Sequence, residues 1–415
     1  MKISIDPVIK SRIQTAWMNL SAEQRNRLMR VVTKAHQQAI VASKGRVAPP
    51  TDASLGHALP LAFSAIYDDQ DGVVSNLDAG VVIAVDEGGE IWGTGKYEQL
   101  DPGWLEAFAE WLEHFILPKH HFSTTPVTVP IQDNVQIGLA GDWGTEDWRT
   151  AANPAPSTNV RTRMEILQPN LSIHLGDVYY AGTGNQEQDL LTKRWPTGSD
   201  WSFALNSNHE MYSGAGAYFK AINNSPFERQ KGCSYFALVN NNWVIIGLDS
   251  AYYSDEEGLY RDGALFPTDG GHQEQLDFLR AQVASATEGK KRVIILTHHN
   301  GLSQDGTSQT KLWSQVMSAF PADSGPALWY WGHVHAGVVY QPQKNGAATV
   351  PCRCCGHGGL PCGPAPEMEN KESTVLWYEH RLADDPDIPQ RILNGFAVLY
   401  LDGPTIKRGV LQREG

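Results

Sequence analysis

The segment that decides the fold reads Val135-Gln-Ile-Gly-Leu-Ala-Gly-Asp-Trp-Gly144, a short apolar run that stops abruptly in a polar, glycine-rich corner. Five more apolar runs of similar length follow it along the chain, at 171–175, 201–205, 243–248, 292–296 and 327–331. Short apolar runs bounded by turn residues are typical of buried strands. Stretches long enough for helices, such as 271–286, separate several of these runs. The alternation predicts an α/β fold.

Residues able to bind a metal ion follow nearly every predicted strand. They stand in the corners Gly141-Asp142-Trp143-Gly144, Gly176-Asp177-Val178-Tyr179-Tyr180, Asn206-Ser207-Asn208-His209-Glu210, Thr297-His298-His299-Asn300 and Gly332-His333-Val334-His335. Ligands of open α/β sheets bind in the crevice outside the carboxyl ends of the strands. Carboxylate, amide, imidazole and phenolate groups all suit divalent or trivalent first-row metals. One such corner is a weak signal, but five in this order predict a shared metal site.

The order of these corners resembles the motif set of the calcineurin-like metallophosphoesterases. The matching elements are GD, GDxxY, Asn-His-Glu, a histidine and GHxH, and they cover residues 135–340. Gly144 stands where the wider superfamily has a histidine, and Tyr180 ends the GDxxY element, a combination that looks like the purple acid phosphatase branch. The resemblance implies a four-layer α/β/β/α sandwich, and the pattern of the preceding residues predicts a smaller α+β region before it.

Carried over position by position, the resemblance also implies two groups of metal ligands. The first metal would be bound by Asp142, Tyr180 and His335. The second metal would be bound by Asn208, His298 and His333, and Asp177 would bridge both.

Two of these assignments have a neighbouring alternative in the sequence. His299 directly follows His298, and Asn300 stands where the family has a proline two positions after its ligand. Tyr179 is likewise a second phenol directly before Tyr180. Spacing favours His298 and Tyr180.

A phenolate ligand affects which metal is expected. Gly144 has no side chain that could replace the superfamily histidine, whereas Tyr180 supplies a hard, anionic oxygen. Such a ligand favours Fe(III) at that position, with Fe(II), Zn or Mn at the second. A tyrosinate-to-iron charge-transfer colour is then expected.

The expected reaction follows from what two cations a few ångströms apart do to a phosphate group. They lower the pKa of a shared water, neutralise phosphoryl oxygens and orient the phosphorus for in-line attack by a bridging hydroxide. The resemblance implies that His209 protonates the leaving oxygen as a general acid and that Glu210 holds its imidazole. Ser207 replaces the glycine that the family has before Asn208, so the local backbone can differ there.

The expected activity is that of a phosphomonoesterase of the acid phosphatase kind. A phosphodiesterase or nuclease would use the same metal ligands, so the sequence keeps this activity as an alternative. A non-catalytic metal-binding module is disfavoured, because the ligand set is complete.

Composition limits the expected partners. Lys+Arg 33 against Asp+Glu 46 gives a formal net charge of -13, which favours a small phosphoester substrate over extended nucleic-acid binding. No apolar stretch approaches bilayer length, so no membrane partner is expected. The odd number of cysteines, four of them within 352–362, does not resemble a disulfide framework. Together with the lack of a signal-peptide pattern at the N-terminus, this cysteine usage predicts a cytoplasmic protein. The sequence makes no prediction of the oligomeric state.

The cysteine-rich stretch 351–363 has two interpretations. Cys352-x-x-Cys355 has the spacing of a zinc site, although no second well-spaced pair follows beyond His357 and Cys362. A glycine-rich loop that shapes the pocket is favoured, because glycines let the backbone approach an anion closely.

The sequence divides into an accessory region at 1–130 and a catalytic domain at 131–415. In the accessory region, Ser21 and Gln24 have the spacing of a capping box and predict a helix that ends near Gly45. A strand, turn and strand are expected over 80–92, followed by a helix around 104–112. No catalytic residue is predicted in this region, and its role is left open.

Overall fold

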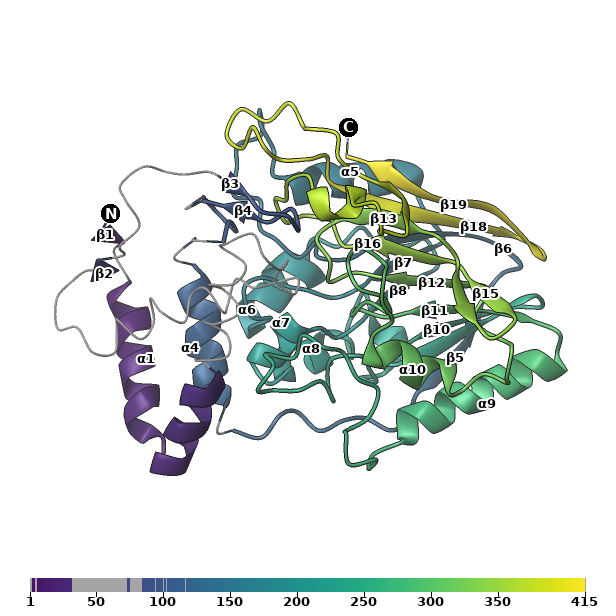
Figure 1. The fold of residues 1–415 in the computed structure, drawn as a ribbon, viewed down its shortest axis with the longest axis horizontal. Helices are drawn as coiled ribbons and strands as arrows, with labels where there is room; N and C mark the ends of the chain where they lie inside the picture. The colour runs from purple at the N-terminus through teal and green to yellow at the C-terminus, as the bar shows by residue number, and fades with distance from the viewer. Residues whose placement is uncertain are drawn as a thin grey trace.

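Two β-sheets lie face to face, and helices cover the outer face of each (Figure 1). The structure is a computed structural model that describes residues 2–3, 6–31, 73–74 and 84–414, apart from residues 94, 100, 102 and 116. The order of its layers is helix, sheet, sheet, helix. The expected four-layer α/β/β/α sandwich is therefore confirmed.

The larger sheet contains eight of the described strands, in the order β17-β13-β16-β12-β11-β10-β9-β5. In that order they span Val375–Tyr378, Gly337–Tyr340, Cys352–Cys355, Leu328–Trp331, Arg292–Leu296, Trp243–Gly247, Phe236–Val239 and Val127–Pro130. β10, β11, β12 and β16 are parallel, whereas β9 and β13 run antiparallel to β10 and β16. The carboxyl ends of β11 and β12 therefore meet at one edge.

The smaller sheet has the order β19-β18-β6-β7-β8. Its strands span Thr405–Arg413, Gly395–Asp402, Asn134–Ala140, Leu171–His174 and Trp201–Ala204. β6, β7 and β8 are parallel and lie side by side in chain order, and β18 pairs antiparallel with β6. The six apolar runs of the sequence are thus strands β6, β7, β8, β10, β11 and β12, as predicted.

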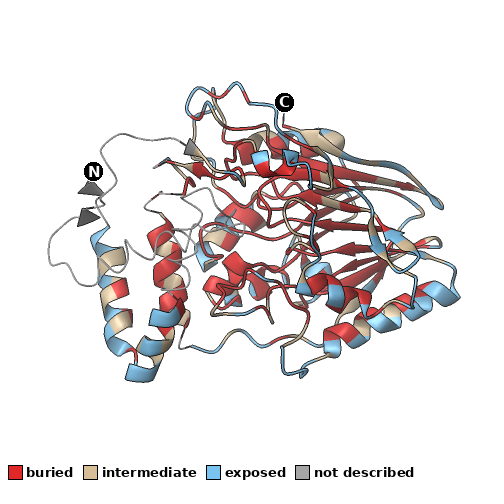
Figure 2. Cartoon of the chain, viewed as in Figure 1, coloured by how far each residue is buried: buried red, intermediate tan, exposed pale blue. Residues whose placement is uncertain are grey.

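The apolar runs are buried on both faces. Along β10, Trp243 and Ile245 contact the smaller sheet, while Val244 and Ile246 contact the helices on the other side. Successive side chains of a strand point to opposite faces, so a strand between two layers is apolar throughout. Figure 2 shows both sheets buried and the outer side of the covering helices exposed. These helices are α9 (Glu274–Glu288) and α10 (Lys311–Met317) on the larger sheet and α5 (Pro156–Leu167) on the smaller.

Shorter elements connect these layers or precede them. They are α6 (Gly184–Gln186), a π-helical turn at Glu187–Thr192, α7 (Asn208–Tyr212), α8 (Gly216–Ala221), 3-10 turns at Glu228–Gln230 and Pro366–Glu369, strands β14 (Gln343–Asn345) and β15 (Ala348–Val350), and strands β1 (Lys2–Ile3) and β2 (Val73–Val74).

The predicted N-terminal elements are present where the structure describes them. Ser21 N donates to Gln24 Oε1 (2.8 Å) and Gln24 N donates to Ser21 Oγ (3.2 Å), so the capping box is confirmed. The helix runs over 22–31, and its predicted end at Gly45 lies outside the described residues. The other predicted elements are strands β3 (Ala84–Val85) and β4 (Ile91–Trp92) and helix α4 (Trp104–His114).

One helix, α1 (Pro7–Asn19), was not predicted. Its signal was available, because Asp6 accepts a hydrogen bond from Val8 N (2.7 Å) and Pro7 occupies the first helical position. α1 and α4 lie side by side (Figure 1). Arg12 joins them through the carboxylates of Glu110 (2.6 Å) and Glu113 (2.9 Å).

The division at residue 130 stays a prediction. Val127–Pro130, assigned from the sequence to the accessory region, forms the edge strand β5 and pairs with β9 of the larger sheet. Among the described residues, Val127 is the first that belongs to the larger sheet. No helix within the described residues is both long and apolar enough to cross a membrane. All five cysteines are free and buried, and the cytoplasmic location also stays a prediction.

Ile294 on β11 is fully buried between the sheets, whereas Ile166 on α5 is 69% exposed. We expect Ile294→Ala to lower the free energy of unfolding by about 2–5 kcal/mol, because it removes buried methyl groups and leaves a cavity. The same substitution at Ile166 should change this free energy by less than about 0.5 kcal/mol. Urea denaturation measures both, and equal losses would contradict the assigned core.

Candidate metal centre

Polar side chains from five strand ends form one buried cluster. They follow β6, β7, β8, β11 and β12, are at most 5% exposed, and are Asp142, Asp177, Asn208, His298, His333 and His335. Asp142, Asp177 and His333 have φ angles of 55°, 74° and 64°. Positive φ is uncommon outside glycine, and such strained residues concentrate at functional sites. The chain thus turns sharply at three strand ends and directs these side chains inward.

Glycines beside these residues allow the close approach. A Cβ atom at Gly332 would lie 2.7 Å from Asp142 Oδ2, and one at Gly176 would lie 2.6 Å from His298 Nδ1. Gly176 also has a φ of 103°, which a residue with a side chain rarely adopts. The glycines of the GD and GH motifs are therefore required by packing around the cluster.

One half of the cluster surrounds His335. Its Nε2 lies 3.5 Å from Asp142 Oδ1 and 3.2 Å from the hydroxyl of Tyr179. The same hydroxyl lies 3.2 Å from Asp177 Oδ2. Asp142 is held in place by His333 N, which donates to its Oδ2 (2.9 Å).

The other half surrounds His298. Its Nδ1 donates to the carbonyl of Leu175 (2.8 Å), so its Nε2 carries the lone pair in the neutral ring. That Nε2 lies 2.9 Å from Asn208 Oδ1 and 3.3 Å from Asp177 Oδ1. Asn208 is oriented by its Nδ2, which donates to Tyr212 (3.2 Å). Three electron-pair donors thus face one another.

This arrangement fits a pair of cations. One oxygen of Asp177 faces each half, and atoms of Asp142, Asp177 and His298 lie within 4.8 Å of one another. His333 Nδ1 is buried and has no hydrogen-bond partner among the described residues. Burial, reinforced by His299 and His298, lowers the pKa of His333 well below its usual value. Its imidazole is therefore neutral, the form that binds metal.

Of the two adjacent histidines, His298 is the better candidate for a metal ligand. Both ring nitrogens of His299 are already used, because Nδ1 bonds with Ser250 Oγ (2.9 Å) and Nε2 donates to the carbonyl of Tyr260 (2.7 Å). His299 lies within 4.8 Å of His298 and His333 in a second group of potential ligands. Its hydrogen bonds give it a structural role instead.

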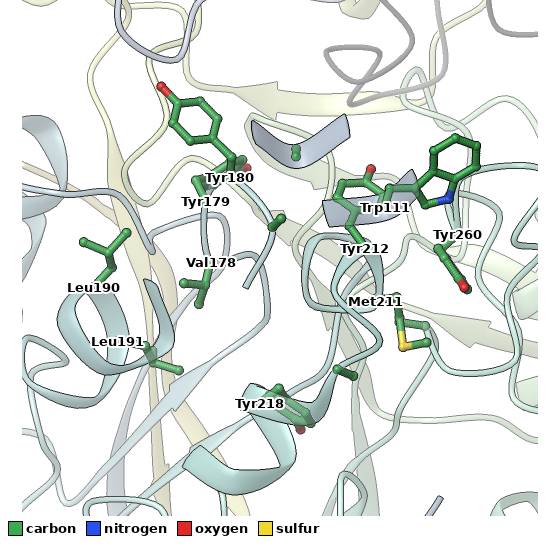
Figure 3. Close-up of a cluster of buried hydrophobic side chains, with 14 of the residues drawn as sticks. Trp111, Val178, Tyr179, Tyr180, Leu190, Leu191, Met211, Tyr212, Tyr218 and Tyr260 are labelled. Atoms are coloured by element: carbon green, nitrogen blue, oxygen red, sulfur yellow. The ribbon is translucent and has the colours of Figure 1, made fainter. Parts of the chain in front are cut away.

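Tyr180 does not lie where the resemblance implied. Its hydroxyl donates to Asp101, and its ring packs against Trp104 and Tyr97 with centroids 4.9 and 4.8 Å apart. In Figure 3 this ring extends away from the labelled residues of α7. Burial, followed by the charge of Asp101, raises the pKa of Tyr180 above its usual value, so the phenol stays neutral. Tyr179, the alternative phenol, occupies the cluster.

His209 lies at the edge of the cluster, with Nε2 3.8 Å from Asp177 Oδ2. Its Nδ1 donates to the carbonyl of Tyr180 (2.6 Å). The expectation that Glu210 holds this imidazole needs correction, because Glu210 Oε2 bonds with Ser207 Oγ. Ser207 is the N-cap of α7 and also contacts Asp177. The Ser-x-x-Glu spacing of a capping box was the sequence signal for this contact.

One contact to the cluster and one contact to Tyr180 beside it come from residues that the sequence did not single out. Glu90 Oε1 accepts a hydrogen bond from His335 Nδ1 (2.8 Å), and Asp101 accepts from Tyr180. Both acceptors belong to the accessory region. They are distant in sequence from the motifs, so no spacing rule pointed to them.

The cysteine-rich loop packs behind Asp142. A Cβ atom at Gly356 would lie 2.9 Å from Asp142 Oδ2, and one at Gly358 would lie 2.5 Å from the carbonyl of Gly141. Within the described residues, no cysteine belongs to a group that could hold a metal ion. These contacts favour the loop that shapes the site over the zinc site.

The comparison with protein families decides what this domain is. Residues 135–337 match the model of the calcineurin-like phosphoesterases. This segment is a calcineurin-like phosphoesterase domain. The match includes every donor from Asp142 to His335 and leaves out Glu90 and Asp101. No curated protein matches the chain.

Solved structures that are similar to this chain include two phosphatases. A dimetal phosphatase from Danio rerio is 14% identical with a TM-score of 0.44, covering 68% of this chain and 99% of that chain. A purple acid phosphatase from yellow lupin (Lupinus luteus) is 13% identical with a TM-score of 0.46, covering 68% of this chain and 53% of that chain.

The calcineurin-like phosphoesterase domain makes the protein a metal-dependent phosphoester hydrolase. The expected enzyme class is confirmed. The family uses two metal ions, and the two halves of the cluster supply suitable donors for both.

The adjacent histidines allow a matched test of the ligand assignment. We expect His298→Ala to bind at least one metal ion fewer per chain than the unmodified protein. His299→Ala should keep its full metal content. Its free energy of unfolding should fall by about 1–3 kcal/mol, because the substitution leaves buried polar groups unpaired. Elemental analysis and thermal unfolding measure the two effects, and metal loss confined to His299→Ala would reverse the assignment.

Proposed function

We propose that the protein is a phosphomonoesterase that hydrolyses small phosphoesters at a dinuclear metal centre. The proposed ligands are Asp142, Asp177, Tyr179, Asn208, His298, His333 and His335. The orientation of Asp177 carries the proposal: its Oδ1 lies 3.3 Å from His298 Nε2, and its Oδ2 lies 3.2 Å from the Tyr179 hydroxyl. A carboxylate shared by two donor sets is suited to bridge two cations.

Two bound cations would supply a nucleophile at neutral pH, neutralise the phosphoryl oxygens and align the phosphorus for in-line displacement. The chain contributes rigid donors. The carbonyl of Leu175 holds Nδ1 of His298, and Glu90 holds Nδ1 of His335. Each contact fixes the ring so that Nε2 faces the cluster, as outer-shell partners of metal ligands do.

His209 is the proposed general acid. The carbonyl of Tyr180 binds the proton on Nδ1, so the proton available for transfer is on Nε2. Nε2 points toward the cluster, 3.8 Å from Asp177 Oδ2. The ring is therefore oriented to donate a proton to a leaving oxygen at the cluster. Trp104 packs against the ring, with centroids 5.8 Å apart, and keeps it in place.

The surroundings of the site favour a small substrate over a long polymer. The proposed ligands are at most 5% exposed, and the formal net charge of -13 repels polyanions. Both features disfavour a long nucleic-acid strand or a membrane surface as partner. The phosphodiesterase activity is retained as an alternative outcome of the test below.

The proposed metals are Fe(III) in the half near His335 and Fe(II), Zn or Mn in the other. The phenol of Tyr179 replaces that of Tyr180 as the candidate iron ligand, because its hydroxyl lies 3.2 Å from both Asp177 Oδ2 and His335 Nε2. A hard, anionic oxygen suits a trivalent ion.

The adjacent tyrosines test this assignment by colour. Protein loaded with Fe(III) should show visible charge-transfer absorption that Tyr179→Phe abolishes and Tyr180→Phe retains. Absorption spectra with iron content measured on each sample give the result. If Tyr180→Phe alone removes the band, the phenol from the family motif is the ligand and the placement of Tyr179 is not relevant to the metal.

A hydrolysis screen tests the activity itself. The protein, supplied with Fe, Mn or Zn, should hydrolyse p-nitrophenyl phosphate faster than bis-p-nitrophenyl phosphate. The hydrolysis rate of Asp177→Ala should fall by more than the roughly 10- to 100-fold that is typical when a partner of a metal ligand is removed, because this substitution removes the bridging ligand itself. Preference for the diester would favour the phosphodiesterase. Unchanged hydrolysis by Asp177→Ala would contradict the proposed centre.

A further inference from the structure

We infer that Glu90, which lies outside the phosphoesterase segment 135–337, is a positioning residue for the metal centre. Glu90 Oε1 accepts a hydrogen bond of 2.8 Å from Nδ1 of His335, and its side chain is nearly fully buried. The inference rests on the proposed function in one respect, since it takes His335 as a metal ligand.

The hydrogen bond determines which nitrogen of His335 faces the cluster. A carboxylate can only accept, so the proton of the neutral ring resides on Nδ1. Nε2 then carries the lone pair, and it lies 3.5 Å from Asp142 Oδ1. Carboxylate partners of metal-binding histidines fix the orientation of the ring in this way. Glu90 therefore orients His335 as a ligand.

Glu90 is itself fixed on both sides. Its Oε2 accepts a hydrogen bond of 2.5 Å from Gln99 Nε2, so both carboxylate oxygens have a partner. Its backbone N donates to Asp86 Oδ1 (2.9 Å), which also accepts from Gly88 N (3.0 Å). The turn between β3 and β4 thus holds the carboxylate in one position.

The turn between β3 and β4 is docked on the catalytic domain. Gly363 N donates to the carbonyl of Gly89 (2.7 Å), and Gln304 Nε2 donates to the carbonyl of Gly88 (2.6 Å). A Cβ atom at Gly89 would lie only 2.8 Å from the carbonyl of Gly363. The cysteine-rich loop, which ends at Gly363, therefore supports the turn that places Glu90 beside His335.

In the other half of the centre, the hydrogen bond described for His298 does not involve Glu90. Nδ1 of His298 is held by the carbonyl of Leu175, which lies on the phosphoesterase segment itself. Glu90 thus acts directly on a ligand of one metal position, and the carbonyl that holds His298 at the other position does not depend on Glu90. This asymmetry gives the test a readout that a general loss of stability would not produce.

The experiment measures Zn²⁺ affinity of the full chain by competition with a chromophoric chelator. Glu90→Ala should weaken one of two binding steps about 10- to 100-fold and leave the other unchanged. Glu90→Gln should have a smaller effect, because its amide oxygen still accepts from Nδ1. Glu98→Gln is the matched control, a buried carboxylate of the same region whose hydrogen bond is to Gly95 N.

Unchanged affinity in Glu90→Ala, or equal weakening of both steps in Glu90→Ala and Glu98→Gln, overturns the inference. If Glu90→Ala does not fold, Glu90→Gln decides, and wild-type affinity in that variant overturns it. His335→Ala separates the two levels of the argument. If His335→Ala loses one ion while the Glu90 variants keep wild-type affinity, only the inference about Glu90 is rejected. If His335→Ala still binds two ions tightly, His335 is not a ligand, and both the ligand set and the proposed function are rejected.

Discussion

The arrangement of the candidate metal centre depends on the buried carboxylate of Asp177, whose two oxygens face different sets of donors. A carboxylate in such a place is costly unless cations or hydrogen-bond donors compensate for the lost water. The parallel strands β6, β7, β8, β11 and β12 bring the compensating groups together at their carboxyl ends. Left-handed backbone at Asp142 and His333 and the neighbouring glycines follow from the same requirement.

The sequence predicted the sandwich and most of the candidate site, because the relevant signals are local. Each strand is an apolar run of the right length, and each donor follows its strand within a few residues. The order of the motifs along the chain then identified the family. Helix α1 was missed although its signals, Asp6 and Pro7, are also local.

Contacts between distant segments could not be read from the chain. Spacing favoured Tyr180, whereas the hydroxyl of Tyr179 lies in the cluster. The ring of Tyr180 is surrounded instead by Asp101, Tyr97 and Trp104, which are distant in sequence. The partners of His299 likewise come from distant segments, at Ser250 and Tyr260. Glu90 and His335 are separated by 245 positions, and a single glutamate in an irregular region has no pattern that predicts its partner.

Enclosure of the donors has a consequence for how the ions arrive. The side chains that would bind them are at most 5% exposed, with α4 packed over Tyr179 and His209. Ions can therefore load or exchange only when the covering residues move, so the rate of metal exchange is tied to an opening of the protein rather than to diffusion. An ion incorporated before the accessory region docks would be retained kinetically, and the metal found in the purified protein would then record the conditions under which the chain folded.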